Sequence, residues 1–367
     1  MGGTWGEYLR LSIFGESHGK CVGIVINGLG AGLELDLDFI DKELQRRRPG
    51  RVATYSSARE EKDRFEILSG YFNNRTTGAP LTCVIWNQDP KSEDYDEIKG
   101  IIRPGHADYT ARKKYSGFND YRGGGHFSGR LTAPLVLAGA IAKQVLRLRE
   151  VTIGSHILSI GDIKGKGFDP VKIEPKALQS LTEQDFPTLD PELAVLMKEK
   201  LARVRKEKDS VGGVVETAIV GLPAGLGSPF FDSLESKMAH LLFSIPAVKG
   251  VEFGAGFAIT EMLGSEANDE FTLQEGRVVT VTNHSGGIQG GITNGMPVLF
   301  RTAFKPTPSI GKTQKTVDLE KMEELEITIK GRHDVCIVPR AVPVVEAVAA
   351  ITILDLMLEK DGNGWIK

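Results

Sequence analysis

Two kinds of hydrophobic pattern divide this chain into predicted strands and predicted helices. Strands are predicted where β-branched and aromatic residues are frequent or alternate with polar ones. These runs are residues 8–14, 21–26, 81–86, 151–160, 214–221, 278–283, 296–304 and 325–330. Helices are predicted where apolar residues recur at helical spacing. These runs are residues 37–48, 131–148, 191–208, 231–243 and 342–359. The two kinds do not alternate regularly, which argues against a doubly wound fold.

Two of the predicted helices, 131–148 and 342–359, are apolar around almost their whole circumference. Helices of this kind are buried. Because they also carry Lys143, Arg147 and Glu346, neither is expected to span a membrane. We therefore predict an α+β fold in which sheets enclose buried helices. No linker, low-complexity stretch or short repeat interrupts the pattern, so we expect a single catalytic domain over residues 1–367.

The composition excludes several classes of protein. Of the 367 residues, 41% are hydrophobic and 25% charged, as is typical of a globular protein. The formal net charge of −3 gives no general attraction to nucleic acid or to membranes, so neither is expected as a partner. The three cysteines are far apart, and no secretory signal pattern is visible. We expect a cytoplasmic protein without a bound metal.

Most of the histidines lie in predicted turns that contain Gly, Ser or Pro. Five of the seven histidines lie there, namely His18, His106, His126, His284 and His333. Side chains on such turns are well placed to meet a ligand, and imidazole changes its charge near neutral pH. A polar turn with a surface histidine is the simpler interpretation of any one segment, but the number of segments favours a functional role. Structural roles are expected for His156 and His240, which lie inside a predicted strand and a predicted helix.

Arginines gather in the same parts of the sequence. Arg46, Arg47 and Arg48 end the first predicted helix, where the helix dipole favours cations, so a solvated helix end is one interpretation. Four more arginines lie in turns near the histidines, namely Arg51, Arg103, Arg130 and Arg332. Guanidinium groups bind carboxylates and phosphates through paired hydrogen bonds. The second interpretation is therefore a small substrate with more than one anionic group.

Two further segments are candidates for phosphate binding. The Gly-rich connection 286–295 lets the backbone approach a ligand closely, although it matches neither a P-loop nor a dinucleotide fingerprint. The segment Lys305-Pro306-Thr307-Pro308-Ser309 offers an ammonium, hydroxyls and a stiff backbone, or else it forms an ordinary Pro-rich turn. Asp334 precedes a predicted helix and is either a structural carboxylate or a candidate base.

Seven segments, taken in order along nearly the whole chain, carry a resemblance to a known family. They are Gly15-Glu16-Ser17-His18-Gly19, Arg46-Arg47-Arg48-Pro49-Gly50, Arg103-Pro104-Gly105-His106-Ala107-Asp108, Gly123-Gly124-Gly125 through Ser128-Gly129-Arg130, Gly290-Gly291, Lys305-Pro306-Thr307 and Arg332-His333-Asp334-Val335-Cys336. Together they closely resemble chorismate synthase. Many members of that family have Arg where this chain has His126, and Arg51 departs from the family's spacing.

The resemblance implies a carbon–oxygen lyase. Members of the family convert 5-enolpyruvylshikimate 3-phosphate to chorismate by 1,4-elimination of phosphate and a hydrogen on C6, the last step of the shikimate pathway to aromatic amino acids. It also implies reduced FMN as the cofactor with no net redox change, and a homotetramer with a β-α-β sandwich of antiparallel sheets. Because no dinucleotide fingerprint is visible, we expect an external flavin reductant or reductase rather than direct use of NADP(H).

The resemblance also implies roles for single residues. His18 would protonate the departing phosphate, His106 would neutralise the N1 side of the flavin, and Asp334 would act near flavin N5 in removing the C6 hydrogen. Ser17 and Ser128 would hydrogen-bond within this relay. The substrate's anions would be bound by Arg47, Arg103, Arg130 and Arg332. The flavin would contact His126, Phe127, Ser128, Gly290, Lys305, Pro306, Thr307, Pro308, Ser309 and Arg332.

Two alternatives stay open at the level of sequence. One is a different FMN enzyme on the same scaffold. The other is a binding module for anionic polymers built on residues 46–51, which the net charge of −3 disfavours.

Overall fold

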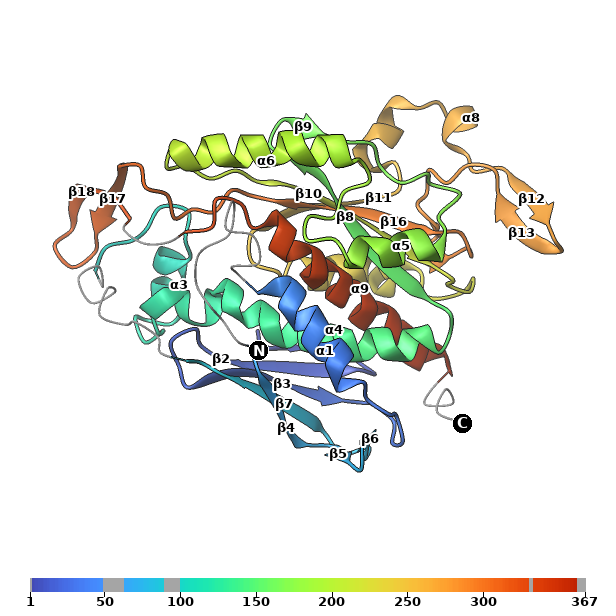
Figure 1. Ribbon diagram of the computed structural model, residues 1–367, viewed down its shortest axis with the longest axis horizontal. Coiled ribbons are helices and arrows are strands. Elements are labelled where there is room, and N and C mark those ends of the chain that lie inside the picture. The colour runs from blue at the N-terminus through green and yellow to red at the C-terminus, as the bar shows by residue number, and fades with distance from the viewer. Residues whose placement is uncertain (1, 49–62, 89–99, 330–332, 362–367) are drawn as a thin grey trace.

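Two five-stranded sheets enclose a layer of helices in the computed structural model, which describes residues 2–48, 63–88, 100–329 and 333–361 (Figure 1). In sheet order, the first sheet contains β1 (Thr4–Trp5), β2 (Arg10–Gly15), β3 (Cys21–Asn27), β7 (Leu81–Trp86) and β4 (Phe65–Ser69). The second contains β11 (Val248–Phe253), β16 (Val298–Phe304), β10 (Gly213–Val220), β8 (Thr152–Ile160) and β9 (Ile163–Lys164). Every pairing within both sheets is antiparallel.

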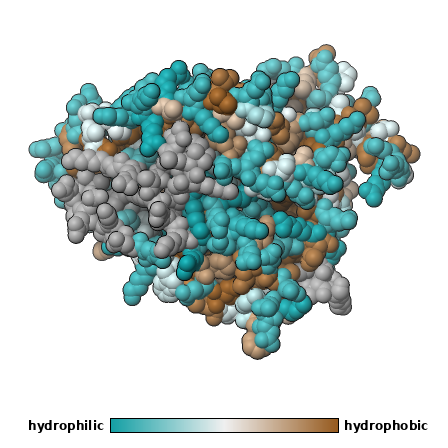
Figure 2. Space-filling view, viewed as in Figure 1, coloured by the Kyte–Doolittle hydropathy of each residue, from teal (hydrophilic) through white to brown (hydrophobic). Residues whose placement is uncertain are grey.

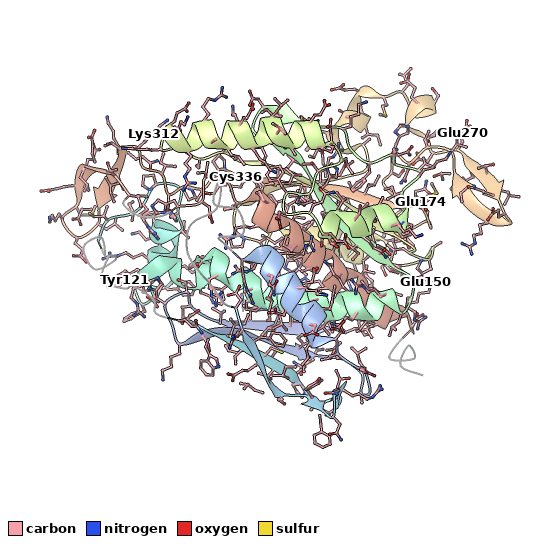
Figure 3. The ribbon with its side chains drawn as sticks, in the orientation of Figure 1. Tyr121, Glu150, Glu174, Glu270, Lys312 and Cys336 are labelled. Carbon is pink, nitrogen blue, oxygen red and sulfur yellow. The ribbon has the colours of Figure 1, made fainter. Side chains whose placement is uncertain are left out.

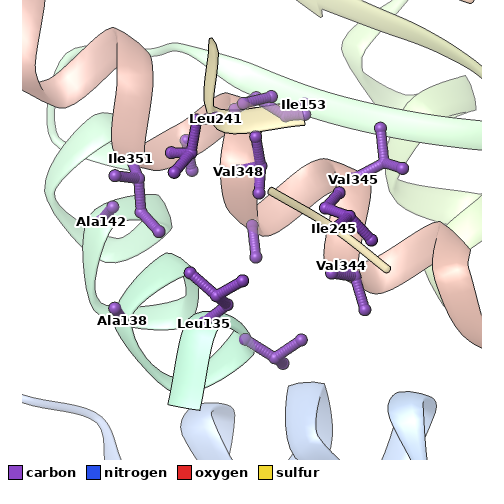
Figure 4. Close-up of a cluster of buried hydrophobic side chains, with 14 of the residues drawn as sticks. Leu135, Ala138, Ala142, Ile153, Leu241, Ile245, Val344, Val345, Val348 and Ile351 are labelled. Carbon is purple, nitrogen blue, oxygen red and sulfur yellow. The ribbon is translucent and has the colours of Figure 1, made fainter. Parts of the chain in front are cut away.

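The helical layer between the sheets supplies most of the hydrophobic core. Its members are α1 (Leu37–Arg47), α4 (Thr132–Arg147), α7 (Leu234–Leu242) and α9 (Val338–Asp361). Figure 4 shows Leu135 of α4, Leu241 of α7 and Val348 of α9 converging in this core. The backbones of α4 and α9 approach closely, because a Cβ added at Gly139 would lie only 2.2 Å from the Cβ of Ala347.

Helix α9 shows how completely this layer is enclosed. Among the described helices, it is the one long and apolar enough to cross a membrane by length and composition alone. Its most apolar stretch is nevertheless entirely buried inside the protein. Such a helix belongs to the core of the fold, because its apolar circumference is covered on every side.

Four charged side chains are buried together within the helical layer. The Lys143 ammonium lies 2.6 Å from a carboxylate oxygen of Glu43 and 2.6 Å from one of Glu346. Arg46 pairs with the same two carboxylates, at 3.0 Å and 2.6 Å. The backbone amide of Ser155 in β8 also donates to Glu346. Two cations and two anions therefore balance, and each buried charge has partners, as burial demands.

A second buried carboxylate ties the two ends of the described chain together. Asp355, near the end of α9, accepts hydrogen bonds from the backbone amides of Tyr8 and Leu9 at 2.9 Å and 2.8 Å. Lys237 of α7 also donates to it. The segment leading into β2 is thereby fixed to α9.

The remaining elements lie outside the sheet–helix–sheet layers. The helices are α3 (Asp108–Lys114), α5 (Pro175–Thr182), α6 (Pro191–Lys206) and α8 (Gly264–Ala267), and the 3-10 turns are Arg122–Phe127, Gly129–Leu131, Phe230–Asp232 and Gly256–Glu261. The two-stranded ribbons are β5 (Tyr71–Phe72) with β6 (Arg75–Thr76), β12 (Phe271–Gln274) with β13 (Arg277–Thr280), β14 (Ile288–Gln289) with β15 (Ile292–Thr293), and β17 (Gln314–Asp318) with β18 (Glu323–Ile327).

The predicted α+β fold with helices between antiparallel sheets is confirmed, but several predicted bounds were wrong. Helix α9 begins at Val338, four residues before the predicted start, because Pro339 occupies its first turn, where no amide donor is needed. Helix α7 begins at Leu234 rather than at residue 231, since Ser233 caps it with a hydrogen bond from the Ser236 amide. Of the two interpretations of the end of α1, the structure does not support a solvated helix end, because Arg46 and Arg47 are buried.

Candidate active site

A large cleft opens where α4 and α9 begin and where α1 ends. Its volume is about 2390 Å³, well above the roughly 300–1,000 Å³ of an ordinary ligand pocket, so it has room for two ligands. In Figure 3, Tyr121, which lines this cleft, lies at one end of the helical layer, and Glu150 lies at the far end of α4. The N-termini of α4 and α9 both face the cleft, and their dipoles favour bound anions there.

Most of the side chains singled out in the sequence line this one cleft. They are Ser17, His18, Arg47, Arg103, His106, His126, Phe127, Ser128, Arg130, Lys305, Thr307, Pro308, Ser309, His333 and Asp334. They come from turns and helix ends between residues 17 and 334, so the fold brings distant segments together. Arg332 and Arg51 lie outside the described residues.

The His18 turn packs against the Gly-rich segment before α4. The backbone amide of Ser17 donates to the Gly125 carbonyl at 3.1 Å, and its hydroxyl donates to the Arg122 carbonyl at 3.1 Å. Gly123 has a φ of +59°, and a Cβ there would lie 2.4 Å from the His18 ring. Glycine is therefore required at position 123, both for its left-handed backbone and for the space that His18 occupies.

His106 also lines the cleft, where Ser309 holds its ring in place. Its Nε2 atom lies 2.8 Å from the Ser309 hydroxyl oxygen, which is buried. Burial lowers the pKa of His106, and the neighbouring Arg103, Lys305 and His333 lower it further, to about 4. The imidazole is therefore neutral near pH 7, because nearby cations disfavour its charged form.

The turn that carries His106 is stabilised by its own ion pair. Arg103 makes two parallel contacts of 2.8 Å with the Asp108 carboxylate. Although burial disfavours the charged carboxylate, the hydrogen bonds from Arg103 lower the pKa of Asp108. Lys305 donates to the Gly105 carbonyl at 2.6 Å and so joins this turn to the segment after β16.

Arg47 and Arg130 share one buried carboxylate, that of Asp63. Arg47 lies 2.8 Å from one Asp63 oxygen, and Arg130 pairs with the other. Burial opposes ionisation of Asp63, but Arg47 and Arg130 outweigh it and lower its pKa. Two guanidinium groups therefore flank one buried carboxylate at this wall of the cleft.

Asp334 is paired with Arg340 in the first turn of α9. The guanidinium of Arg340 contacts the Asp334 carboxylate, and its Nε donates to the Arg47 carbonyl at 3.0 Å. Arg340 therefore links the candidate base to the end of α1.

The wall formed by residues 126–128 and 305–309 fits a flat, phosphate-bearing cofactor. The Thr307 hydroxyl is buried and has no hydrogen-bond partner among the described residues, which leaves it available to a ligand. Phe127 is 41% exposed and presents an aromatic ring to the cleft. His126 donates from Nδ1 to the Gly15 carbonyl at 2.8 Å, which fixes its ring beside the His18 turn.

Two predicted flavin contacts lie away from the cleft lining. Pro306 is in the correct segment but does not line the cleft. Gly290 lies in the turn of the β14–β15 ribbon, and it is the next residue, Gly291, that contacts Ser233 and the start of α7. The fold therefore does not bring Gly290 together with the other predicted residues within one chain.

Sequence reasoning missed several residues of the cleft. Asp63, Asn87 and Arg340 all hold predicted site residues, and His240, expected to be structural, lines the cleft. Asn87 follows a predicted strand directly, and Arg340 is a charge beside an apolar helix, so both offered a weak signal. His156 was assigned correctly, since it hydrogen-bonds to Glu216 within the second sheet.

The fold and the cleft together define an enzyme that acts on a small anionic compound at the end of a sheet–helix–sheet sandwich. The family model for chorismate synthase matches residues 9–358. The chain therefore belongs to the chorismate synthase family, whose members are carbon–oxygen lyases.

Individual relatives agree with this assignment. The chorismate synthases of Archaeoglobus fulgidus and Thermococcus gammatolerans are 49% and 48% identical, each over 97% of both chains. That of Methanosarcina barkeri is 48% identical over 97% of this chain and 96% of its own. A crystal structure of chorismate synthase, 31% identical, matches with a TM-score of 0.77 over 98% of this chain and 94% of that chain.

Proposed function

We propose that this protein converts 5-enolpyruvylshikimate 3-phosphate to chorismate in the presence of reduced FMN. The observation that carries the proposal is the convergence of His18, His106 and Asp334 with paired arginines in one cleft. In this 1,4-elimination, the C6–H electron pair forms a new ring double bond, the existing ring double bond shifts by one position, and phosphate departs with the C–O pair. Atoms and electrons balance without net oxidation or reduction.

The arginines would bind the anionic groups of the substrate. Arg47 and Arg130 both line the cleft and flank the buried Asp63 carboxylate. Guanidinium groups suit phosphate and carboxylate, and the N-termini of α4 and α9 add to the positive potential. Arg103 and Arg332 would complete the set of substrate arginines.

Two side chains, those of His18 and Asp334, would transfer protons. His18 would give a proton to the departing phosphate, and the contacts of Ser17 with Arg122 and Gly125 hold its turn in place. Asp334 would take part in removing the C6 hydrogen while Arg340 orients its carboxylate. Ser128, whose hydroxyl accepts a bond from the Arg130 amide, would join the relay. Such proton transfers typically contribute roughly 10²–10⁴-fold.

Reduced FMN, when bound, would supply a transient electron that eases cleavage of the C–O bond. The residues that would hold it are His126, Phe127, Ser128, Lys305, Pro306, Thr307, Pro308, Ser309 and Arg332. Among them, the orphaned Thr307 hydroxyl is the strongest support for a ligand at this wall. Gly290 would contribute only if a neighbouring copy supplies it, because it is absent from this chain's cleft lining.

The cellular setting belongs to the same proposal. The protein would act in the cytoplasm as a homotetramer, with flavin reduced by an external reductant or reductase. Supplying NADPH with oxidised FMN, and no other protein, would test this last point. Bleaching of the flavin absorbance under those conditions would overturn it.

The alternatives have less support. A polymer-binding module on residues 46–51 is disfavoured because Arg46 and Arg47 are buried and ion-paired. A different FMN enzyme on the same scaffold would bind flavin but fail to eliminate phosphate from this substrate.

An anaerobic assay tests the proposal directly. Purified protein, dithionite-reduced FMN and 5-enolpyruvylshikimate 3-phosphate are mixed, and chorismate is followed by its ultraviolet absorbance. We expect product only with reduced FMN, with a loss of roughly 100-fold or more in His18→Ala and in Asp334→Ala. Asp162→Ala, an exposed carboxylate outside the cleft, serves as the control. No product from folded protein that binds flavin would favour the alternative FMN enzyme.

A further inference from the structure

We propose that Asn87 is a positioning residue that holds the candidate acid His18 and the candidate substrate ligand Arg130 in one fixed arrangement. This inference rests on the proposed function, because it assigns Asn87 a part in the same reaction. Asn87 lines the cleft, at the first position after β7.

The side-chain amide of Asn87 forms three hydrogen bonds, and all three lead to the site. Its Nδ2 donates to the Glu16 carbonyl at 3.0 Å and to the Gly19 carbonyl at 2.9 Å. Its Oδ1 accepts from Nε of Arg130 at 3.1 Å. The first two bonds hold the His18 turn at residues on either side of His18. The third bond fixes the guanidinium of Arg130.

The sheet explains why an asparagine at this position reaches both groups. Strands β3 and β7 pair so that Cys21 is opposite Trp86. Asn87, the first residue after β7, therefore lies beside the turn that precedes β3, and its backbone amide donates to the Lys20 carbonyl at 3.0 Å. The register of the sheet brings Asn87 to the His18 turn without a long connecting loop.

The amide is the side chain that these partners require. Two carbonyls need two donors, and a guanidinium needs an acceptor, so the primary amide of asparagine satisfies all three. A carboxylate of the same size would keep the acceptor for Arg130 but would oppose two carbonyl oxygens with no donor. Asn87→Asp therefore releases the His18 turn selectively, whereas Asn87→Leu releases both His18 and Arg130.

The two substitutions, Asn87→Asp and Asn87→Leu, should change different kinetic constants. Asn87→Asp is expected to lower kcat roughly 100-fold, the loss that follows a displacement of about 1 Å at a reacting group. It should change KM less than about threefold, because Arg130 keeps its acceptor. Asn87→Leu should lower kcat similarly and also raise KM for the substrate, about tenfold, since Arg130 loses its acceptor.

A double-mutant cycle separates positioning from general destabilisation. If Asn87 acts through His18, then Asn87→Asp should cost less than about threefold in kcat when His18 is already alanine. An undiminished loss in that background would overturn the inference. An unchanged kcat in Asn87→Asp alone would also overturn it. Should Asn87→Asp fail to fold, Asn87→Leu replaces it in the same cycle, with the same expectation for kcat and the raised KM given above.

Gln144→Glu is the matched control. Gln144 also uses its amide to hold backbone groups, donating to the Asp36 carbonyl at 3.1 Å and accepting from the Asp36 amide at 2.8 Å, but it lies outside the cleft. It should leave kcat and KM unchanged. If the protein without substitutions forms no chorismate, the proposed function fails, and if it is active while Asn87→Asp matches Gln144→Glu, only this inference fails.

Discussion

The protonation of His106 depends on which charges surround it. Arg103, Lys305 and His333 disfavour the imidazolium and Asp108 favours it, and together with burial they lower its pKa to about 4. An anionic ligand in the cleft would oppose those cations. His106 is therefore neutral before anions bind and becomes easier to protonate once they do.

This pKa predicts how acid affects stability. The native imidazole resists protonation down to about pH 4, whereas the imidazole in the unfolded chain, at its ordinary pKa of 6.5, already takes up a proton. The free energy of unfolding should therefore fall as the pH decreases from 6.5 to about 4. Urea titrations across this range should show a shallower fall in His106→Gln. Identical slopes in the two proteins would contradict the assignment.

Asp63 offers a second prediction at this scale. Asp63→Asn keeps the shape of the side chain but leaves Arg47 and Arg130 without their shared anion. Removing one member of a buried ion pair typically costs about 3–5 kcal/mol of stability. We expect the free energy of unfolding, measured by urea titration, to fall by roughly this amount. The exposed pair of Asp162 with Lys200 provides the control, since Asp162→Asn should cause no measurable loss. Equal effects of the two substitutions would show that Asp63 is not a buried charge.

The sequence singled out candidate site residues whose chemistry stands out in turns, such as His18 and His106, and both line the cleft. It could not predict Asp63 or Asn87, because their importance lies in which atoms they contact across the fold. An asparagine after a strand is common, and only the pairing of β3 with β7 brings this one to the His18 turn.

The crossing of α4 and α9 makes a prediction at the scale of the element. Alanine is a better helix former than glycine by about 1 kcal/mol, yet a Cβ at Gly139 would lie 2.2 Å from that of Ala347. Overpacking of this kind costs about 1–3 kcal/mol or more. Gly139→Ala should therefore lower the melting temperature. Gly264→Ala, in open space at the start of α8, should not. A more stable Gly139→Ala protein would mean that the helices separate easily.

The buried charges around Lys143 make another prediction. Burial opposes ionisation of Glu43, but Lys143 and Arg46 outweigh it and lower its pKa to about 2. Lys143→Met leaves Glu43 and Glu346 with Arg46 alone, and should cost about 3–5 kcal/mol near pH 8. The loss should be smaller near pH 5, because one carboxyl can then take up a proton. Lys312→Met, which removes an exposed pair with Asp209, is the control. A loss that does not depend on pH would argue against the role of charge.

Helical periodicity located all four helices of the central layer but not every bound. The apolar run predicted a helix start at Val342, whereas α9 begins at Val338 and includes both Pro339 and Pro343. Strands β4 and β11 were not predicted, because their short segments carry no clear alternation. Tertiary pairing with β7 and β16 decides their structure instead.

At the scale of the whole molecule, one projecting ribbon stands out. The β12–β13 ribbon extends from the right-hand edge in Figure 1, and Figure 2 shows hydrophobic side chains at the surface there. Phe271, Leu273 and Val278 are 63%, 74% and 62% exposed. Exposed apolar groups gathered in this way mark contact surfaces, and a second copy would cover them in the proposed homotetramer.

If this surface is a contact between copies, a charge placed on it should weaken the assembly. Leu273→Lys adds a charge to the ribbon and should lower the molar mass measured by light scattering during size-exclusion chromatography. Leu148→Lys, an exposed leucine at the end of α4, controls for the added charge. A tetramer that survives Leu273→Lys would mean that the ribbon is not its contact surface.

The layered architecture could be predicted because two helices apolar on all sides require a cover on both faces. The order of strands within each sheet could not, since it depends on long-range pairing such as that of β10 with β16. The expectation of one domain over residues 1–367 stays a prediction.

The contact of Asp355 with Tyr8 and Leu9 has a consequence for the order of synthesis. Because Tyr8 and Leu9 precede Asp355 by 347 and 346 residues, a ribosome makes the segment before β2 long before the carboxylate that anchors it. Until α9 has been made, this segment lacks its anchor and α4 lacks the helix that packs against Gly139, so a nascent chain in that state exposes apolar surface. Its yield in cells should therefore depend on chaperones that protect unfinished chains.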